Sequence, residues 1–352
     1  MVGKTTLFKI LTKADIKFTA FSNKKGVSPF GISRVPDSRL DQLTLLFQPK
    51  KTTHAVIEYV DIGALARGKH TQDLNLENVR TVDVLVNVVR AFDTPSLSPK
   101  QDNINPRMKI GELDFELILR DLFIIEKRLE RVEKDLKKMK TLDLHHEKSL
   151  LEKCQEWLEL DKPLRSLELT SEEKKRLRGF TFLSEKPVLH VLNLPDSKAS
   201  ELAGLTEAYQ LQAIADQPNV ETTGVCGKLE AEMAELSDEE ALAFLEDYGL
   251  SESGLVRLIS VTYRLLGLIS FFTVGKDECR AWTIQRGTPA LKAAGTIHSD
   301  LERCFIRAEV MPWDVLLEVK SMVAARQKGL LRLEGKEYVV QDGDTVHFRH
   351  SA

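Results

Sequence analysis

Residues 1–10 read MVGKTTLFKI, which is the second half of a phosphate-binding loop followed at once by an apolar run. The complete motif, G-x-x-x-x-G-K-[ST], follows a buried strand and opens a helix. Gly3, Lys4 and Thr5 supply its last three positions. In such a loop the lysine reaches the β- and γ-phosphates of a nucleotide, and the hydroxyl binds Mg²⁺. The stretch therefore predicts a nucleotide site, although a Gly-Lys-Thr sequence also occurs on surfaces that bind nothing.

The composition bounds the class of protein. A chain of 352 residues is too long for one ordinary domain, so two or three are expected. The net charge of −3 gives no general basic field for nucleic acid, so DNA is not an expected partner. Four cysteines without C-x-x-C spacing indicate reduced thiols. No apolar run of membrane-spanning length and no signal peptide is visible, which makes the cytoplasm the expected compartment.

Short apolar runs predict the strands of a sheet. They lie at 55–60, 84–89, 187–192 and, more weakly, 219–225. Helical patterns at 5–14 and 199–216 lie between or beside them. Alternation of strands and helices is typical of a parallel α/β sheet, which binds its ligands at the carboxyl ends of the strands.

A long amphipathic pattern interrupts the sheet. Apolar residues recur along one face of 112–140, and further helices are expected near 144–160 and 171–178. Thr170 and Glu173 have the spacing of a capping box for the last of these. The pattern predicts an antiparallel helical hairpin inserted in the sheet domain. Its charged stretch KRLERVEKDLKKMK reads as a solvated helix face, with contact to RNA as the alternative.

The sequence pattern changes in the C-terminal part of the chain. Residues 255–269 predict an apolar-faced helix, and the strands FFTV and RAWTI follow. The Gly/Thr/Pro-rich stretch QRGTPALKAAGTIH comes next. The stretches KEYVV and TVHF then predict two strands around an Asp-Gly turn. We expect a small separate α+β domain at 271–352.

Polar residues at two strand ends complete the candidate site. Asp61 follows AVIEYV, where a phosphate-loop enzyme needs a carboxylate for Mg²⁺. Asn193 and Asp196 follow PVLHVL with the N-x-x-D spacing of a base-reading element, in which the aspartate accepts from two guanine N–H groups. The alternative for Asp61 is a strand-end cap, and the alternative for Asn-Leu-Pro-Asp is a simple turn.

With these pieces in order, the chain resembles the YchF/Obg-like ATPase family of Obg-related P-loop proteins. The resemblance is carried by VGKTTLFKILTKA, VPDSRLDQL at 35–43, EYVDIGALARG at 58–68, KLEAEMAEL at 228–236, 280–310 and 335–348. It implies a P-loop NTPase parallel sheet with an inserted helical coiled-coil hairpin and a C-terminal β-grasp (TGS) domain. The implied boundaries are 1–110 and 181–270 for the P-loop domain, 111–180 for the insertion and 271–352 for the TGS domain.

The resemblance also implies an activity and site residues. It implies hydrolysis of ATP, in preference to GTP, with Mg²⁺ and with association with the ribosome or its RNA and proteins. The residues implied to bind nucleotide are Val2, Gly3, Lys4, Thr5, Thr6, Asn193, Leu194, Asp196, Gly227 and Lys228. Thr5 and Asp61 would hold Mg²⁺. Lys4 would be catalytic, and Leu65 stands where Ras-like enzymes have a water-orienting glutamine.

Several positions depart from the family pattern. The first switch has Lys24 and Lys25 where the family has a threonine-bearing stretch, and the second switch has Ala64 where a D-x-x-G glycine is expected. Asp196 replaces a more usual glutamate, which favours guanine slightly. Most of these changes fall on the γ-phosphate side, so we expect slow turnover. The alternative is a catalytically degraded docking module that binds RNA or protein through its insertion and TGS domain.

The phosphate loop has no strand and no first glycine before it in this sequence. We interpret Met1 as an internal methionine, with the natural start about 10 residues upstream. The intact mass of the protein from its native source tests this expectation.

Overall fold

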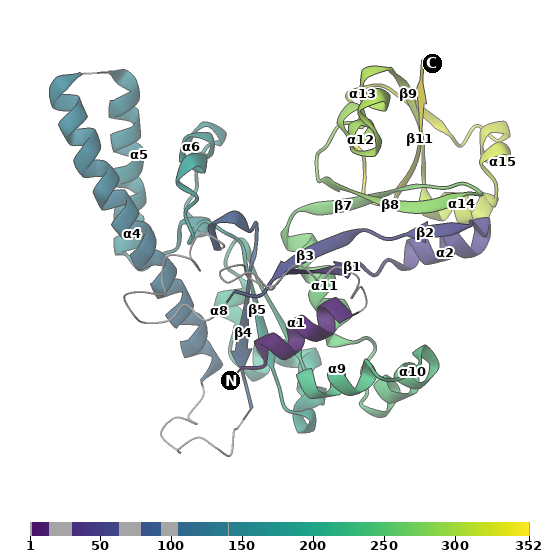
Figure 1. Cartoon of the computed structure of the whole chain (residues 1–352), viewed down its shortest axis with the longest axis horizontal. Helices are drawn as coiled ribbons and strands as arrows, with labels where there is room; N and C mark the ends of the chain where they lie inside the picture. Colours follow the sequence, from purple (N-terminus) through teal and green to yellow (C-terminus); the bar gives the residue numbers. More distant parts are fainter. Residues whose placement is uncertain (1, 14–29, 63–78, 93–104, 140, 352) are drawn as a thin grey trace. The chain divides into compact units, whose positions relative to one another are not determined.

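The structure, a computed structural model, describes residues 2–13, 30–62, 79–92, 105–139 and 141–351. The chain forms two compact units, Met1–Gly31 with Tyr59–Val261 and Ile32–Glu58 with Thr262–Ala352. Each has its own sheet (Figure 1). Each also has its own cluster of buried hydrophobic side chains. Among the helices described, none is both long and apolar enough to cross a membrane. The division into four segments predicted from the sequence stays a prediction.

A three-stranded parallel sheet in the order β4-β5-β6 forms the centre of the first unit. Its strands are β4 (Leu85–Arg90), β5 (Val188–Asn193) and β6 (Val220–Val225). Every residue of β5 is buried, as expected for a central parallel strand covered on both faces. Because Asn193 lies opposite Val225 in the register, the loops after β5 and β6 leave the same edge side by side. The three strands confirm the sequence prediction. β1 (Phe30–Arg34) and β3 (Val56–Val60) form a separate pair.

Short helices surround this sheet. They are α1 (Lys4–Lys13), η4 (Asp196–Gly204), α7 (Leu205–Ala208), α8 (Gln212–Ala215), α9 (Gly227–Met233), α10 (Asp238–Asp247) and α11 (Gly254–Leu265). The helical segment predicted at 199–216 is present as three short pieces, η4, α7 and α8. It is interrupted at Gly204, with a φ of −114°, and at Gln210, which takes a left-handed φ of 53°. The pieces still bury their leucines against β5.

The insertion is an antiparallel pair of long helices, visible beside the sheet of the first unit (Figure 1). Its elements are α4 (Pro106–Lys138), α5 (Leu142–Glu159), η2 (Leu164–Ser166), α6 (Ser171–Leu177) and η3 (Arg178–Phe180). The predicted hairpin and the Thr170–Glu173 capping box are confirmed. α4 starts earlier than predicted because Asn105 caps it and Pro106 occupies its first turn. Arg128 bonds Glu147 at 2.7 Å across the hairpin.

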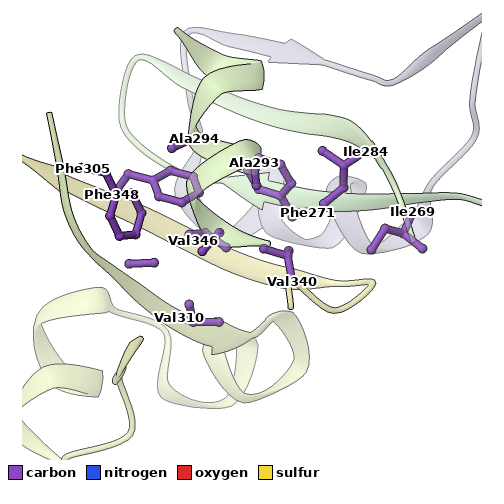
Figure 2. Close-up of a cluster of buried hydrophobic side chains, with 12 residues drawn as sticks. Ile269, Phe271, Ile284, Ala293, Ala294, Phe305, Val310, Val340, Val346 and Phe348 are labelled. Carbon is purple, nitrogen blue, oxygen red and sulfur yellow. The ribbon is translucent and has the colours of Figure 1, made fainter. Parts of the chain in front are cut away.

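The second unit contains a six-stranded mixed sheet in the order β10-β9-β11-β7-β8-β2. Its strands are β2 (Lys51–Thr53), β7 (Leu268–Thr273), β8 (Glu278–Gln285), β9 (Phe305–Pro312), β10 (Arg332–Glu334) and β11 (Asp344–His350). Its helices are α2 (Ser38–Phe47), α12 (Ala290–Ile297), α13 (Ser299–Arg303), α14 (Trp313–Val319) and α15 (Met322–Gln327). Figure 2 shows its core, where the Phe271 and Phe348 rings meet edge to face with centroids 6.0 Å apart.

One strand predicted in this part was wrong, and one predicted helix ends earlier than expected. The KEYVV stretch makes one isolated bridge, between Val339 and Pro289, and β11 pairs with β9 and β7. The Gly/Thr/Pro-rich stretch contains α12, whose alanines are fully buried because the helix lies close on the sheet. The helix predicted at 255–269 ends at Leu265, since Gly267 turns the chain with a φ of 68°.

Candidate functional site

The start of α1 is shaped by a glycine. Gly3 has a φ of 88°, a left-handed conformation that a side chain would strain. Its carbonyl accepts the N–H of Leu7 at 2.9 Å, so the helix begins directly after the turn. The first backbone N–H groups of a helix have no partner within it, and the helix dipole favours an anion there. The first turn of α1 contains no acidic residue that would repel phosphate.

Two side chains from the start of α1 meet the carboxylate that follows β3. The Lys4 ammonium lies 3.0 Å from Oδ1 of Asp61, and it also donates to the carbonyl oxygen of Ile62. Thr5 Oγ1 donates to Oδ2 of the same aspartate at 3.4 Å. Lys4 and Asp61 form an ion pair without hydrogen-bond alignment, since Oδ1 of Asp61 has no hydrogen-bond partner among the described residues. The sequence prediction that these three residues share one site is consistent with this arrangement.

The chemistry of these groups fits Mg²⁺. Among the described residues, no cluster of three or more His, Cys, Asp or Glu side chains could hold a metal ion. Mg²⁺ bound to a nucleotide needs fewer protein ligands, because phosphates and water complete its shell of six oxygens. Thr5 and Asp61 supply a hydroxyl and a carboxylate with one oxygen unfilled. They are the residues that would hold such an ion.

Asn193, at the end of β5, holds three segments together. Its Nδ2 donates to the carbonyl oxygen of Val2 at 3.1 Å, and its Oδ1 accepts the backbone N–H of Gly227 at 2.9 Å. A Cβ on Gly3 would lie 2.3 Å from Nδ2 of Asn193, and one on Gly227 would lie 3.1 Å from Oδ1. The buried amide therefore depends on both glycines for its space. Asn193 holds the turn before α1 against the start of α9, and its predicted contact with the base stays a prediction.

The other residues of the N-x-x-D element differ in their surroundings. Leu194 is only 2% exposed, and it belongs to the hydrophobic cluster beneath the site. Its predicted contact with a base stays a prediction, and the buried position argues against it. Asp196 lies at the start of η4, where its Oδ2 accepts a 2.6 Å hydrogen bond from the ammonium of Lys228. This partnership raises the pKa of Lys228 above its ordinary value.

The remaining predicted residues are either exposed or outside the described part of the chain. Val2 and Thr6 are exposed at the start of α1, and only the carbonyl of Val2 has a contact within the site. Leu65 and the switch positions Lys24, Lys25 and Ala64 lie outside the described residues. Nothing about their predicted roles is tested by the structure.

Sequence reasoning missed Glu230, although it lies within the KLEAEMAEL stretch. Its buried carboxylate accepts the backbone N–H of Gly254 at 2.6 Å and so caps the start of α11. Burial raises the pKa of Glu230. A charged residue three positions after a glycine that opens a helix was the available signal. Glu230 fixes α9, and with it the residues that begin that helix.

Comparison with known proteins identifies the family to which this chain belongs. The sequence model of the family YchF-GTPase_C, described as "Protein of unknown function (DUF933)", matches residues 268–351. The chain is 41% identical over 352 residues to the ribosome-binding ATPase YchF of Bacillus subtilis (strain 168), covering 99% of this chain and 96% of that protein. The chain belongs to the YchF family. A YchF from Escherichia coli O157:H7 is 37% identical over 351 residues, with the same coverage.

A solved structure supports the same assignment. The fold superposes on the Schizosaccharomyces pombe YchF GTPase with a TM-score of 0.85 and 28% identity, covering 99% of this chain and 94% of the other. The predicted resemblance to YchF proteins and the predicted fold class are thereby confirmed. The chain has the α/β architecture of a P-loop NTPase followed by a C-terminal domain.

Proposed function

We propose that this YchF protein binds and hydrolyses ATP, with GTP as a second substrate, and acts as a ribosome-associated switch in the cytoplasm. The observation that carries the proposal is the meeting of Lys4 and Thr5 with Asp61, since the two segments lie far apart in sequence. Relatives that are named ribosome-binding ATPases, and one that is named a GTPase, support the activity and the partner.

Different residues of the site bind the phosphates and the metal ion. The start of α1 takes the phosphates, where free backbone N–H groups and the helix dipole favour them. Lys4 turns from Asp61 to the β- and γ-phosphates, because the phosphates carry more negative charge than one carboxylate. Thr5 and Asp61 would hold Mg²⁺, which neutralises charge on the transferred phosphoryl group when it is bound. Leu65 is proposed to flank the attacking water.

Nucleotide titration tests the site directly. We expect fluorescent ATP and GTP analogues to bind this chain in the presence of Mg²⁺. Lys4→Ala should lose most of that affinity, because it removes the ammonium that leaves Asp61 for the phosphates. Asp61→Asn should weaken binding chiefly when Mg²⁺ is present. Lys9→Ala is the matched control, since Lys9 is an exposed lysine on the same helix. Equal affinities in Lys4→Ala and Lys9→Ala would refute the phosphate site.

Sedimentation with ribosomes tests the switch. A nucleotide-dependent change in the fraction of protein that sediments with ribosomes is expected, and it should disappear in Lys4→Ala. Phosphate release measured on the same samples tests hydrolysis, with slow turnover expected. Ribosome binding that ignores nucleotide, together with no phosphate release, would instead identify a docking module.

A further inference from the structure

The segment between β1 and β3 belongs to the second unit. The chain enters that unit between Gly31 and Ile32 and leaves it between Glu58 and Tyr59. Within the unit, β2 pairs with β8 and α2 lies against β8 and α14 (Figure 1). β3 therefore begins in the second unit and ends in the first, directly before Asp61.

Arg39, in the first turn of α2, holds this segment to the C-terminal part of the second unit. Its Nη1 lies 3.0 Å from Oδ2 of Asp342, and its Cζ lies 5.3 Å from the centre of the Phe272 ring. It also donates two 2.8 Å hydrogen bonds to Asp37, the N-cap of α2. A Cβ on Gly343 would lie 3.2 Å from its Nη1, so the backbone packs closely on the guanidinium. Arg39 therefore joins the cap of α2 to the turn before β11.

The end of this segment is also fixed before β3 begins. Val35 donates its N–H to the carbonyl oxygen of Ala55 at 2.8 Å, which closes the segment at its base. Thr53, the last residue of β2, donates from Oγ1 to Oε1 of Glu278 at 2.6 Å. Two residues separate β2 from β3. Because a strand is extended and rigid secondary elements carry coupling between sites, a shift at the start of β3 also moves Asp61.

The metal site depends on where Asp61 lies. Mg²⁺ requires oxygen ligands in a near-ideal octahedron, so it tolerates little displacement of a carboxylate. The Oδ2 atom of Asp61 is 3.4 Å from Thr5 Oγ1, and these two groups are the proposed protein ligands. The phosphates, in contrast, bind at the start of α1, which belongs to the first unit. A shift of β3 should therefore weaken the binding of Mg²⁺ and not the binding of the phosphates themselves.

We propose that Arg39 is a positioning residue for the metal site, because it anchors residues 35–55 to the second unit and so fixes Asp61 through β3. The inference rests on the proposed nucleotide site and gives the second unit a part in it. Binding of nucleotide with Mg²⁺ then depends on a residue that contacts neither of them. The second unit thereby regulates the metal site in addition to any docking that it performs.

The test is the affinity for a fluorescent ATP analogue, measured in Mg²⁺ and in EDTA. Arg39→Ala should lower the affinity in Mg²⁺ by about twofold to thirtyfold, the range for residues that couple distant sites, and leave the affinity in EDTA unchanged. Arg39→Lys should lower it less, because an ammonium can still pair with Asp342 but lacks the fork that holds two aspartates. Lys50→Ala is the matched control. It removes an ion pair between the same segment and Asp277, with side chains 81% and 87% exposed, and should change neither affinity.

A double variant separates positioning from folding. Asp61→Asn has already lost the carboxylate, so the addition of Arg39→Ala should lower the affinity in Mg²⁺ no further. A general loss of folded structure would instead lower the affinity in both backgrounds, and in EDTA as well. Asp342→Asn removes the other charge of the pair but keeps an oxygen for the Ser270 N–H, which Oδ1 accepts at 3.0 Å. It should therefore resemble Arg39→Ala.

The outcomes separate this inference from the proposed function. If the unchanged chain binds the analogue more tightly with Mg²⁺ and Arg39→Ala matches it, the positioning role is wrong while the nucleotide site stands. If Arg39→Ala lowers the affinity as much in the Asp61→Asn background, it does not act through Asp61, and the role is likewise wrong. If the unchanged chain does not bind the analogue, or binds it equally with and without Mg²⁺, the proposed metal site and the inference fail together.

Discussion

Asn193 and Gly227 are joined by a 2.9 Å hydrogen bond from the backbone N–H of the glycine to the side-chain oxygen of the asparagine. The same amide donates to the carbonyl oxygen of Val2. One buried side chain thus connects the end of β5 to the start of α9 and to the turn before α1. The loops that would contact opposite ends of a nucleotide share a single polar anchor.

Removing that anchor should loosen the first unit and its site together. Asn193→Ala leaves the buried Gly227 N–H without its partner, so we expect a loss of about 1–3 kcal/mol in the free energy of unfolding. Urea denaturation followed by circular dichroism measures it. Gln212→Ala removes an exposed amide that is bonded to Asp216 at 2.7 Å, and it should cost no more than about 0.5 kcal/mol. Equal losses in the two variants would contradict the role of Asn193.

The turn before α1 should tolerate glycine alone. Gly3→Ala would place a methyl group 2.3 Å from the Asn193 amide, in a backbone conformation with a φ of 88°. We expect a cost of about 1–3 kcal/mol from the strained backbone, and weaker nucleotide binding. Gly111→Ala, within α4 and with no atom within 4 Å of the new methyl, should instead gain about 0.5–1 kcal/mol. Thermal unfolding of both variants decides, and a neutral Gly3→Ala would refute the argument.

The candidate site residues are predictions from the sequence, whereas the side-chain partner of Asp196 and the burial of Leu194 could not be predicted. Lys4, Asp61 and Asp196 were recognised because motif spacing and strand ends identify residue types. The pairing of Asp196 with Lys228 depends on the register of β5 against β6, which brings two loops together. The burial of Leu194 depends on the helices η4 and α7 that cover it. Neither feature leaves a local pattern.

Some strands of the fold could likewise be predicted from the sequence, and others could not. The parallel strands were predicted because they are continuous apolar runs, the signature of strands buried on both faces. β2 was missed because its sequence, KTT, is short and polar, and it pairs only with β8 at the sheet edge. KEYVV resembles a strand, but Val340 donates its N–H to the carbonyl oxygen of Thr288 and does not join a ladder. Contacts with distant parts of the chain, and not the local sequence, determine whether these two segments form strands.

Asp121 should fix the helical insertion to the sheet domain. Its two carboxylate oxygens accept the backbone N–H groups of Leu183 at 3.0 Å and Ser184 at 2.7 Å, and the side chain is fully buried. Asp121→Ala leaves both N–H groups unpaired, so we expect a loss of about 3 kcal/mol or more. Asp143→Ala is the control, because its 85% exposed carboxylate pairs with Arg176 at the surface and should contribute less than about 1 kcal/mol.

Hydrogen exchange would show where the loss falls. Removal of Asp121 should speed exchange first at the amides of Leu183 and Ser184, ahead of those in the middle of α5. Unchanged exchange at these two amides would show that the carboxylate does not hold them.

His190 should make stability depend on pH. It lies in the middle of β5, is 0% exposed, and has Asn87 Nδ2 3.1 Å from its Nδ1, while its Nε2 has no hydrogen-bond partner in the described part of the chain. Burial, with a contribution from Arg165, lowers its pKa from 6.5 to about 3. Between these two pKa values the unfolded chain binds a proton at His190 and the folded chain does not. The contribution of His190 to the free energy of unfolding is therefore fully present above pH 6.5, and it falls as the pH drops towards 3. Between pH 7 and pH 5 the loss from this one residue should be about 2 kcal/mol.

The comparison of His190→Leu with the unchanged chain isolates this effect. Leucine cannot take up a proton, so the difference in unfolding free energy between the two proteins should change by about 2 kcal/mol from pH 7 to pH 5. All other titrating groups are common to both and cancel. His146→Gln removes an exposed histidine on α5 and should leave the pH dependence as it is. Parallel pH profiles for His190→Leu and the unchanged chain would mean that the folded protein admits the proton, which a sealed central strand does not allow.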